Sequence, residues 1–143
     1  SDVYKRQEVL LVKLVRTASL SLRVSTPPAE SKECAAAKRY IDENYSRTIT
    51  LDSLAEIAHV NKYYLSHSFK REYGTSPIDY LMKRRITEAK ALLSSTDFSL
   101  TQIAEQIGFR SLAYFSKCFR KVEDISPNEY RKTAARKAPP GNL

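Results

Sequence analysis

The stretch YYLSHSFKREYGTSPIDYL, residues 63–81, returns in altered form as AYFSKCFRKVEDISPNEYR, residues 113–131. A short apolar segment precedes each copy: LAEIA at residues 54–58 and IAEQIGF at residues 103–109. The short segments align at an offset of 49 residues and the long ones at an offset of 50, so the second copy has one extra residue in the turn between them. An internal repeat of this kind indicates one structural unit used twice.

The start of a helix is signalled in the same way within each long copy. A Ser-Pro pair stands at residues 76–77 and again at residues 126–127, and an acid follows two residues after each proline. Serine at the N-cap, proline at the first helical position and an acid at the third form a strong N-terminal pattern. The pattern predicts helices over residues 77–94 and 127–134.

Other helix starts complete the two units. Ser99, with Gln102 three residues later, has the spacing of a capping box and predicts a helix from residue 100. Ser31 is the expected N-cap of an amphipathic helix over residues 32–45, and a short helix is expected to open at Thr50. Each unit is then a short helix, a tight turn and a longer helix, which is helix-turn-helix logic. The predicted fold is all-α, with two helix-turn-helix subdomains joined by a long linker helix.

The turns and helix ends differ between the copies. Gly108 lies in the turn of the second unit, where a positive φ carries no penalty, whereas the first unit has His59 at this place. At the end of the longer helix the first unit has Gly74 and the second has Asp124. We therefore expect the second long helix to end with a more strained or looser backbone.

Each longer helix carries an apolar stripe at 3/4 spacing that is expected to face the core. The stripes comprise Leu65, Phe69 and Tyr73 in the first unit and Phe115, Phe119 and Val122 in the second. Tyr64 and Tyr114 are also interpreted as core residues. Tyr63 falls on the opposite, exposed face, where its ring can contact a thymine methyl or a sugar.

The exposed faces of the longer helices are basic. The chain has 24 Lys and Arg against 16 Asp and Glu, a net charge of +8. Residues 60–73 and 110–122 contain a single acid, Glu72, among the following cations: Lys62, Lys70, Arg71, Arg110, Lys117, Arg120 and Lys121. Ordinary solvated faces usually mix the two signs, so this concentration of cations favours a polyanionic partner such as nucleic acid.

Several function classes lack their motifs. Glycines occur only at positions 74, 108 and 141, which excludes a P-loop or a dinucleotide fingerprint. Two histidines eight residues apart and two isolated cysteines make no metal or disulfide framework. The apolar segment VLLVKLV at residues 9–15 is too short to span a bilayer. We predict no enzyme activity, no cofactor, no metal, no membrane association and a cytoplasmic location.

The ends of the chain carry their own expectations. The sequence has no initiating methionine, and TPPAES at residues 26–31 is typical of a linker. We interpret residues 1–25 as the end of a missing N-terminal regulatory domain or as a non-native leader. Residues 32–133 are the double helix-turn-helix domain, and residues 134–143 are expected to form a basic flexible tail.

From residue 31 to residue 131 the chain resembles the C-terminal DNA-binding domain of the AraC/XylS family of bacterial transcription regulators. The two copies, the short segments before them, Arg85-Ile86 with Ala89, and the final ISPNEYR carry the resemblance. It implies seven helices in two subdomains, with one recognition helix from each in successive major-groove segments of double-stranded DNA. It also implies contact with RNA polymerase in activation, and a small-molecule effector that binds only through the missing N-terminal domain.

The resemblance and the basic faces together define the predicted DNA-binding residues. Those of the first unit are Thr50, Lys62, Tyr63, Ser66, His67 and Lys70, and those of the second are Ser99, Ser111, Leu112, Ala113, Ser116, Lys117 and Arg120. His67 and Lys117 stand where the family often has arginine, which weakens bidentate reading of guanine. Two alternatives stay open: the targeting module of a DNA-repair protein whose catalytic part is missing, and a helical protein-interaction module.

Overall fold

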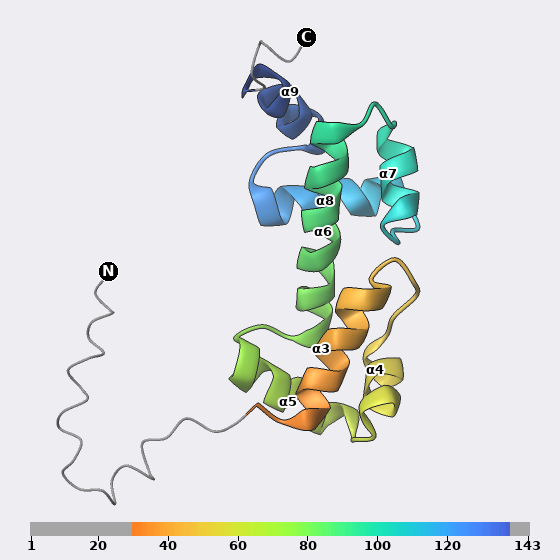
Figure 1. Cartoon of the computed structure of the whole chain (residues 1–143), viewed down its shortest axis with the longest axis vertical. Coiled ribbons are helices and arrows are strands. Elements are labelled where there is room, and N and C mark those ends of the chain that lie inside the picture. The colour runs from red at the N-terminus through yellow and green to blue at the C-terminus, as the bar shows by residue number, and fades with distance from the viewer. Residues whose placement is uncertain (1–29, 138–143) are drawn as a thin grey trace, which may run out of the picture. The chain divides into compact units, whose positions relative to one another are not determined.

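The computed structural model describes residues 30–137, and this part of the chain contains seven helices and no strand (Figure 1). The helices are α3 (Lys32–Asn44), α4 (Leu51–Ala58), α5 (Lys62–Tyr73), α6 (Pro77–Ser95), α7 (Leu100–Gln106), α8 (Leu112–Glu123) and α9 (Pro127–Lys137). The all-α prediction is confirmed. The interpretations of residues 1–25 and of the linker up to residue 29 lie outside the described residues.

Two hydrophobic cores lie along α6. The first is built by α3, α4, α5 and the N-terminal half of α6, and the second by the C-terminal half of α6 with α7 and α8, against which α9 packs (Figure 1). Leu81 of α6 belongs to the first core, whereas Ile86, Ala89 and Leu93 belong to the second. The long helix therefore closes one helix-turn-helix subdomain and opens the next, as predicted.

The predicted N-caps are in place. Ser31 accepts a hydrogen bond from the backbone N–H of Cys34 at 3.1 Å, and Ser76 accepts one from that of Asp79 at 3.1 Å. Ser99 and Gln102 form the reciprocal capping box, with bonds of 3.1 Å and 2.8 Å. Each cap satisfies backbone donors that the first turn of a helix leaves without partners. This is why local sequence located the helix starts.

The backbone at the turns follows the expected pattern of positive φ. His59 has a φ of 60° at the end of α4, and Gly108 has a φ of 103° in the matching turn. The ends of α5 and α8 are left-handed at Gly74 (φ 78°) and at Asp124 (φ 69°). The second unit therefore places a residue with a side chain in a conformation that favours glycine.

An arginine from the third helix further along the chain binds the carbonyls at the C-terminal ends of both α3 and α6. Arg85 of α6 donates to the carbonyls of Tyr45 and Arg47, at 2.6 Å and 2.8 Å, just after α3. Arg131 of α9 donates to the carbonyls of Leu93 and Thr96, both at 3.1 Å, at the end of α6. Neither α3 nor α6 has a basic residue in its own last turn. Each arginine therefore supplies the positive charge that a helix C-terminus favours.

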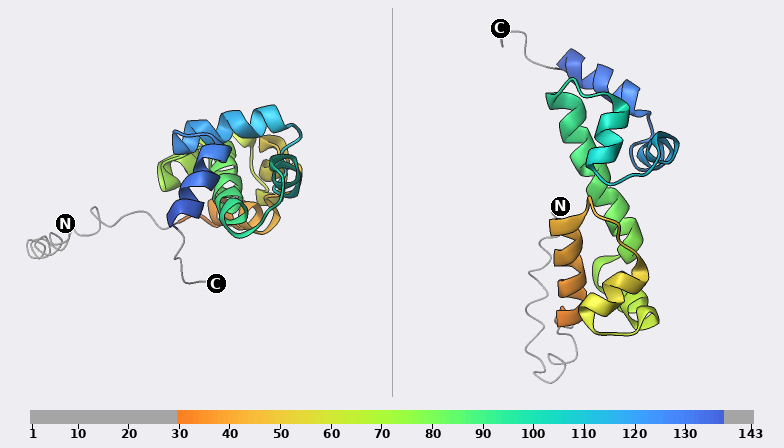
Figure 2. Two further views of the ribbon diagram at one scale, coloured as in Figure 1. Left: turned by 90° about the horizontal axis from the view of Figure 1, so that it is seen from above. Right: turned by 90° about the vertical axis from the view of Figure 1, so that its right-hand side faces the viewer.

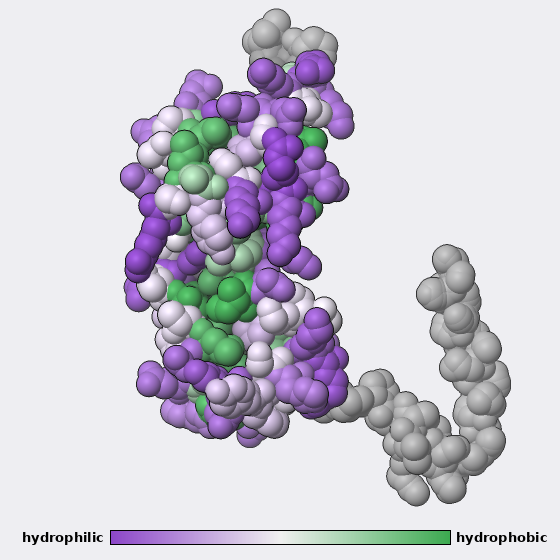
Figure 3. Space-filling model, turned by 180° about the vertical axis from the view of Figure 1, so that it is seen from behind, coloured by the Kyte–Doolittle hydropathy of each residue, from purple (hydrophilic) through white to green (hydrophobic). Residues whose placement is uncertain are grey.

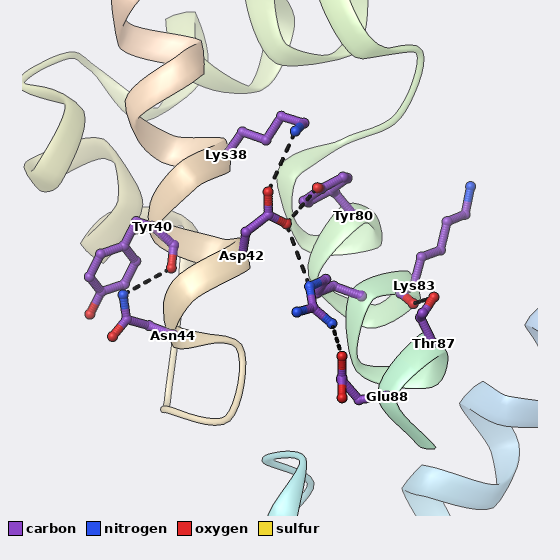
Figure 4. Close-up of polar contacts among 9 residues, drawn as sticks. Lys38, Tyr40, Asp42, Asn44, Tyr80, Lys83, Thr87 and Glu88 are labelled. Carbon is purple, nitrogen blue, oxygen red and sulfur yellow. Dashed lines mark hydrogen bonds and ion pairs between the residues drawn. The ribbon is translucent and has the colours of Figure 1, made fainter. Parts of the chain in front are cut away.

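Polar contacts also join α3 to α6, as Figure 4 shows. The Asp42 carboxylate accepts a hydrogen bond from the Tyr80 hydroxyl at 2.6 Å and lies 3.6 Å from Nε of Arg84. Arg84 pairs in turn with Glu88 at 2.7 Å. Burial, followed by the hydrogen bond to Asp42, raises the pKa of the Tyr80 phenol. The contacts hold the N-terminal half of α6 against α3.

Three sequence expectations were wrong. Tyr64 and Tyr114 are 47% and 48% exposed, and Val122 is 37% exposed, although all were assigned to the core. Tyr64 and Tyr114 directly precede Leu65 and Phe115, about 100° around the helix from the buried stripe. Val122 lies at the end of its stripe, so the 3/4 pattern alone overestimated the extent of the buried face. In addition, α9 continues to Lys137, so residues 134–137 extend a helix and do not begin a tail.

Candidate nucleic-acid interface

Helices α5 and α8 occupy the same position in their units and lie on the same side of α6, with α3 on the other side (Figure 2, right). Asn61 caps α5 by accepting from the N–H groups of Tyr63 and Tyr64, at 2.7 Å and 3.2 Å. Ser111 caps α8 by accepting from the N–H of Tyr114 at 3.1 Å. Buried rings anchor the inner faces of both helices, so their outer faces are held in fixed orientations.

The outer face of α5 presents most of its predicted DNA-binding residues to solvent. Tyr63 is 73% exposed, His67 and Lys70 are exposed, and Ser66 is half-buried. Lys62 is engaged within the protein, because its Nζ lies 3.3 Å from the Asp52 carboxylate and 5.6 Å from the centre of the Tyr63 ring. This pair was not predicted. It fixes the Lys62 ammonium beside the ring and offsets part of its charge.

The outer face of α8 is more apolar at its start and basic further along. Leu112 is 40% exposed and Ala113 is exposed, whereas Ser116 is half-buried. Lys117 and Arg120 are exposed one and two turns later. The Ser111 hydroxyl oxygen accepts the capping bond, and its O–H donor remains for a ligand.

Thr50 and Ser99, predicted to contact phosphate, lie at the N-termini of α4 and α7. Their hydroxyl oxygens accept from the N–H groups of Ser53 and Gln102, and both residues are exposed. Neither hydroxyl donates a hydrogen bond to any residue in the described range 30–137. Each can donate outward from the positive end of its helix, an arrangement that suits an anion.

The charges of the two helices are arranged so that the outer faces are positive. Glu72 turns inward and accepts from the backbone N–H of Ser31 at 3.0 Å, and Glu123 pairs with Lys90 at 3.2 Å. Within the described residues Lys70, Lys117 and Arg120 form no ion pair. Figure 3 views the side of the molecule that carries α8, where hydrophilic residues crowd the margins and apolar residues show in the middle.

The predicted set omitted several cations that lie on or beside these faces. Arg71 and Lys121 are exposed near the C-terminal ends of the two helices, and Arg110 is exposed directly before α8. Arg85 is buried between the two units. The basic composition of residues 60–73 and 110–122 already indicated three of them, whereas nothing in the sequence near Arg85 indicated its contact with the second turn.

The described part of the chain lacks the features of a metal site or a membrane span. No cluster of three or more His, Cys, Asp or Glu side chains suited to a metal occurs there, and none of the described helices is both long enough and apolar enough to cross a bilayer. Cys34 is fully buried, and burial raises the pKa of its thiol. Cys118 is half-buried, and its hydrogen bond with Tyr114 raises the pKa of that phenol.

Comparison with known proteins supports the geometry. A family model described as a helix-turn-helix domain matches residues 54–133. YisR of Bacillus subtilis, named as an uncharacterized HTH-type transcriptional regulator, is 36% identical over 96% of this chain and 47% of its own length. The bifunctional transcriptional activator and DNA repair enzyme AdaA of B. subtilis is 32% identical over 65% of this chain and 44% of its own length. The chain thus spans about half the length of these relatives.

Solved structures show the same arrangement of helices. The C-terminal domain of AraT, a response regulator of Geobacillus stearothermophilus, is 39% identical, with a TM-score of 0.71 over 74% of this chain and 88% of that one. A probable AraC family regulator of Rhodopseudomonas palustris is 26% identical, with a TM-score of 0.65 over 73% of this chain and 98% of that one. The DNA-binding domain of AdpA, solved with a target DNA, is 26% identical and has a TM-score of 0.72 over 78% of this chain and 100% of that one.

Proposed function

Given that the chain belongs to the AraC-type helix-turn-helix family of transcription regulators, we propose that it binds double-stranded DNA sequence-specifically, with α5 and α8 in two adjacent major-groove segments. One observation carries the proposal: two recognition helices present unpaired cations on the same side of one rigid helix. The AdpA domain, which has the same fold, was solved with its target DNA.

The dimensions of α6 suit this arrangement. Its 19 residues span about 28 Å at about 1.5 Å per residue. Successive major-groove openings on one face of B-DNA lie about 34 Å apart. With the widths of the two units added, one chain reaches both openings. The expected site is bipartite, non-palindromic and about two turns long.

The predicted residues divide into those expected to contact base edges and those expected to contact phosphates. We assign contact with base edges to Lys62, Tyr63, Ser66 and His67 of the first unit and to Ser111, Leu112, Ala113, Ser116 and Lys117 of the second. Leu112 and Ala113 offer only apolar contact, which suits the thymine methyl. Lys70 and Arg120 lie further along the helices, and Thr50 and Ser99 at neighbouring helix starts, where contact with phosphates is expected.

The test begins with selection of bound sites from a random DNA pool. A bipartite consensus is expected, and with about five to seven phosphate contacts the slope of log affinity against log salt should be about −4 to −6. Insertion of about five base pairs between the half-elements turns one of them to the opposite face. The affinity should then fall to that of a single half-element. A slope near zero, or unchanged binding of the spaced site, would contradict the two-groove mode.

The DNA-repair alternative has one observation in its favour, the similarity to AdaA. In that reading this chain supplies only DNA targeting, because the described residues bring together no cluster of metal-binding side chains and one of their two cysteines is fully buried. An assay of DNA repair, made on the natural protein with any segment that precedes this chain, separates the alternatives. A helical protein-interaction module is distinguished by its affinity, which should not depend on the salt concentration.

We further propose that the complete regulator activates transcription by contacting RNA polymerase at the nucleoid, with any effector bound by an N-terminal part. The support is the family relationship alone. Transcription in vitro from a promoter that carries the selected site, with purified RNA polymerase, would show whether the transcript level rises, falls or stays unchanged when the protein is added.

A further inference from the structure

Arg85 is a buried cation at the junction of the two units, 5% exposed. Besides the two carbonyl groups after α3, it lies beside the ring of Phe109 from the second unit, whose centre is 5.4 Å from the guanidinium carbon. No carboxylate among residues 30–137 forms an ion pair with it. Charged side chains are almost never fully buried unless they are paired, so this guanidinium lacks the anion that its environment calls for.

Part of the hydrogen-bonding capacity of this side chain is unused. A guanidinium has five N–H donors, of which the carbonyls of Tyr45 and Arg47 occupy one on Nε and one on Nη2. Its Nη1 donates to none of the described residues. Burial lowers the pKa of Arg85 from its ordinary value, but arginine remains charged at neutral pH. The two carbonyls fix the plane of the fork, so the remaining donors are oriented before a ligand arrives.

An open pocket of about 220 Å³ lies against this guanidinium. The first unit lines it with Thr48 and Ile49, and the second with the turn of residues 108–110 and with Tyr114. Figures 1 and 2 show the α3–α4 loop and the α7–α8 turn side by side, level with the middle of α6. The lining contains Arg85 and Arg110 and no acidic residue. The pocket therefore has a positive floor, a positive rim and a hydroxyl donor.

Glycine at position 108 is part of this construction. A Cβ at this position would lie 3.0 Å from Cζ, Nε and Nη2 of Arg85. The backbone of the turn thus packs closely against the guanidinium, which also lines the pocket. A planar fork of this kind matches the oxygens of a phosphate group.

The position of the pocket indicates the source of the phosphate. Arg110 directly precedes Ser111, the N-cap of α8, so the rim of the pocket adjoins the positive N-terminus of a recognition helix. The pocket also lies between the two units. A DNA strand that runs from one recognition helix to the other would pass this place, whereas the faces of α5 and α8 read the grooves on either side.

We propose that this pocket binds a phosphate group, with Arg85 at its floor and Arg110 at its rim, and that in the DNA complex this group is a phosphodiester between the two half-elements. The inference rests on the proposed DNA-binding function and adds a contact that lies outside both recognition faces. Such a contact would fix the spacing of the half-elements without reading a base, because phosphate contacts position a protein on the duplex.

The test uses the site selected from the random pool, with one phosphate at a time between the half-elements replaced by a neutral methylphosphonate. The dissociation constant is measured for the unaltered chain, for Arg110→Ala and for Arg136→Ala, a control that removes an equally exposed cation from the end of α9. One methylphosphonate position should weaken binding by the unaltered chain about tenfold, the usual size of a hydrogen bond to a charged group. Arg110→Ala should bind unmodified DNA about tenfold more weakly and lose clearly less at that position than the unaltered chain does, because only Arg85 then remains to hold the phosphate, whereas Arg136→Ala should keep the full sensitivity.

Three other outcomes would overturn the proposal, and they are distinguishable. If Arg110→Ala keeps full sensitivity at every central phosphate, the pocket does not hold the strand, although DNA binding itself stands. If inorganic phosphate shifts the Gly108 amide resonance but no central position is special, the ligand is a free anion and not DNA. If the unaltered chain binds no selected site at all, the proposed function fails first.

Discussion

The two helix-turn-helix units have the same order of helices, but the sides of their longer helices, α5 and α8, are covered to different extents. On α5 the flank is closed: Glu72 accepts from the backbone N–H of Ser31, and Ser68 is buried. The equivalent residues of α8, fifty positions later, are Val122, which is 37% exposed, and Cys118, which is half-buried. A groove of about 420 Å³ opens there between α8 and α6. The two copies therefore share a buried core, but the second copy lacks the contacts that cover the side of the long helix in the first.

The outer faces of α5 and α8 differ as well. At the start of α5 stand Lys62 and Tyr63, a cation beside an exposed aromatic ring, whereas α8 starts with Leu112 and Ala113. The first unit can donate hydrogen bonds from the side chains that begin its helix, whereas Leu112 and Ala113 of the second offer only apolar contact. Two copies of one fold thus carry different recognition chemistry, because the outer face is not constrained by packing. The following predictions test the comparison.

The largest effect on stability is expected at Arg85 and Arg131, the arginines that bind carbonyls at the ends of α3 and α6. Arg85→Met should lower the free energy of unfolding by about 3–4 kcal/mol, because two buried hydrogen bonds to a charged group are lost. Arg131→Met removes the same number of bonds at a half-buried site and should cost about 1–2 kcal/mol. Urea unfolding followed by circular dichroism measures both. Equal losses would mean that burial between the units adds nothing.

The next effect concerns the glycines. Gly108→Ala should cost about 2–3 kcal/mol, because the new methyl group meets the Arg85 guanidinium in addition to the strain of a φ of 103°. Gly74→Ala has open space around it and should cost only about 1 kcal/mol, for its φ of 78°. Thermal unfolding of the two variants provides the comparison. If Gly74→Ala proves the more damaging, close packing against Arg85 is not the reason for glycine in the second turn.

Substitution of two lysines should distinguish contact with bases from contact with phosphates. Lys117→Ala, on the base-facing side of α8, should weaken binding by about 1–2 kcal/mol and relax the preference at one base pair. Lys70→Ala on α5 should weaken all sequences alike and reduce the salt slope by about one. Binding titrations against single-base variants of the selected site, at several salt concentrations, measure both effects. The assignment is wrong if the two variants exchange behaviours.

The C-terminal ends of α5 and α8 can be compared by exchanging the glycine that ends the first helix with the aspartate that ends the second. Asp124→Gly should stabilise the protein by about 0.5–1 kcal/mol, since its φ of 69° costs glycine little, and Gly74→Asp should destabilise it by a similar amount. Chemical unfolding of both variants and of the double exchange checks this. No gain from Asp124→Gly would show that the aspartate compensates locally for its backbone conformation.

The smallest effect is expected in the pH dependence of stability. The backbone N–H of Ser126 donates to Glu129 at 2.9 Å and lowers the pKa of that carboxyl, whereas Asp79 makes no such bond at the start of α6. A lowered folded-state pKa means that the stabilisation is present above the usual pKa of glutamate and is lost as the pH falls below it. Glu129→Gln should therefore flatten the acid side of the stability curve slightly. Unfolding measured between pH 3 and 7, with Glu105→Gln as an exposed control, checks this.

The sequence by itself determined the helices and their duplication. Ser31, Ser76 and Ser99 located helix starts because a cap bonds to backbone groups only two or three residues away. The buried residues Phe69 and Phe119 followed from helical spacing, since residues three or four apart share a face. The predicted reading faces follow from the same rule, as the side opposite the stripe.

Only the tertiary structure decided what lies at the margins of those faces. The spacing that found Phe119 could not show that Val122 and Tyr114 lie exposed, because the width of a buried face depends on which neighbouring helix covers it. Nor could it bring Arg85 to Gly108, 23 positions away, with the Tyr45 carbonyl on its other side. Caps and stripes act over one or two helical turns, whereas a buried guanidinium takes its partners from three segments, and their meeting depends on how α3, α6 and the α7–α8 turn pack together.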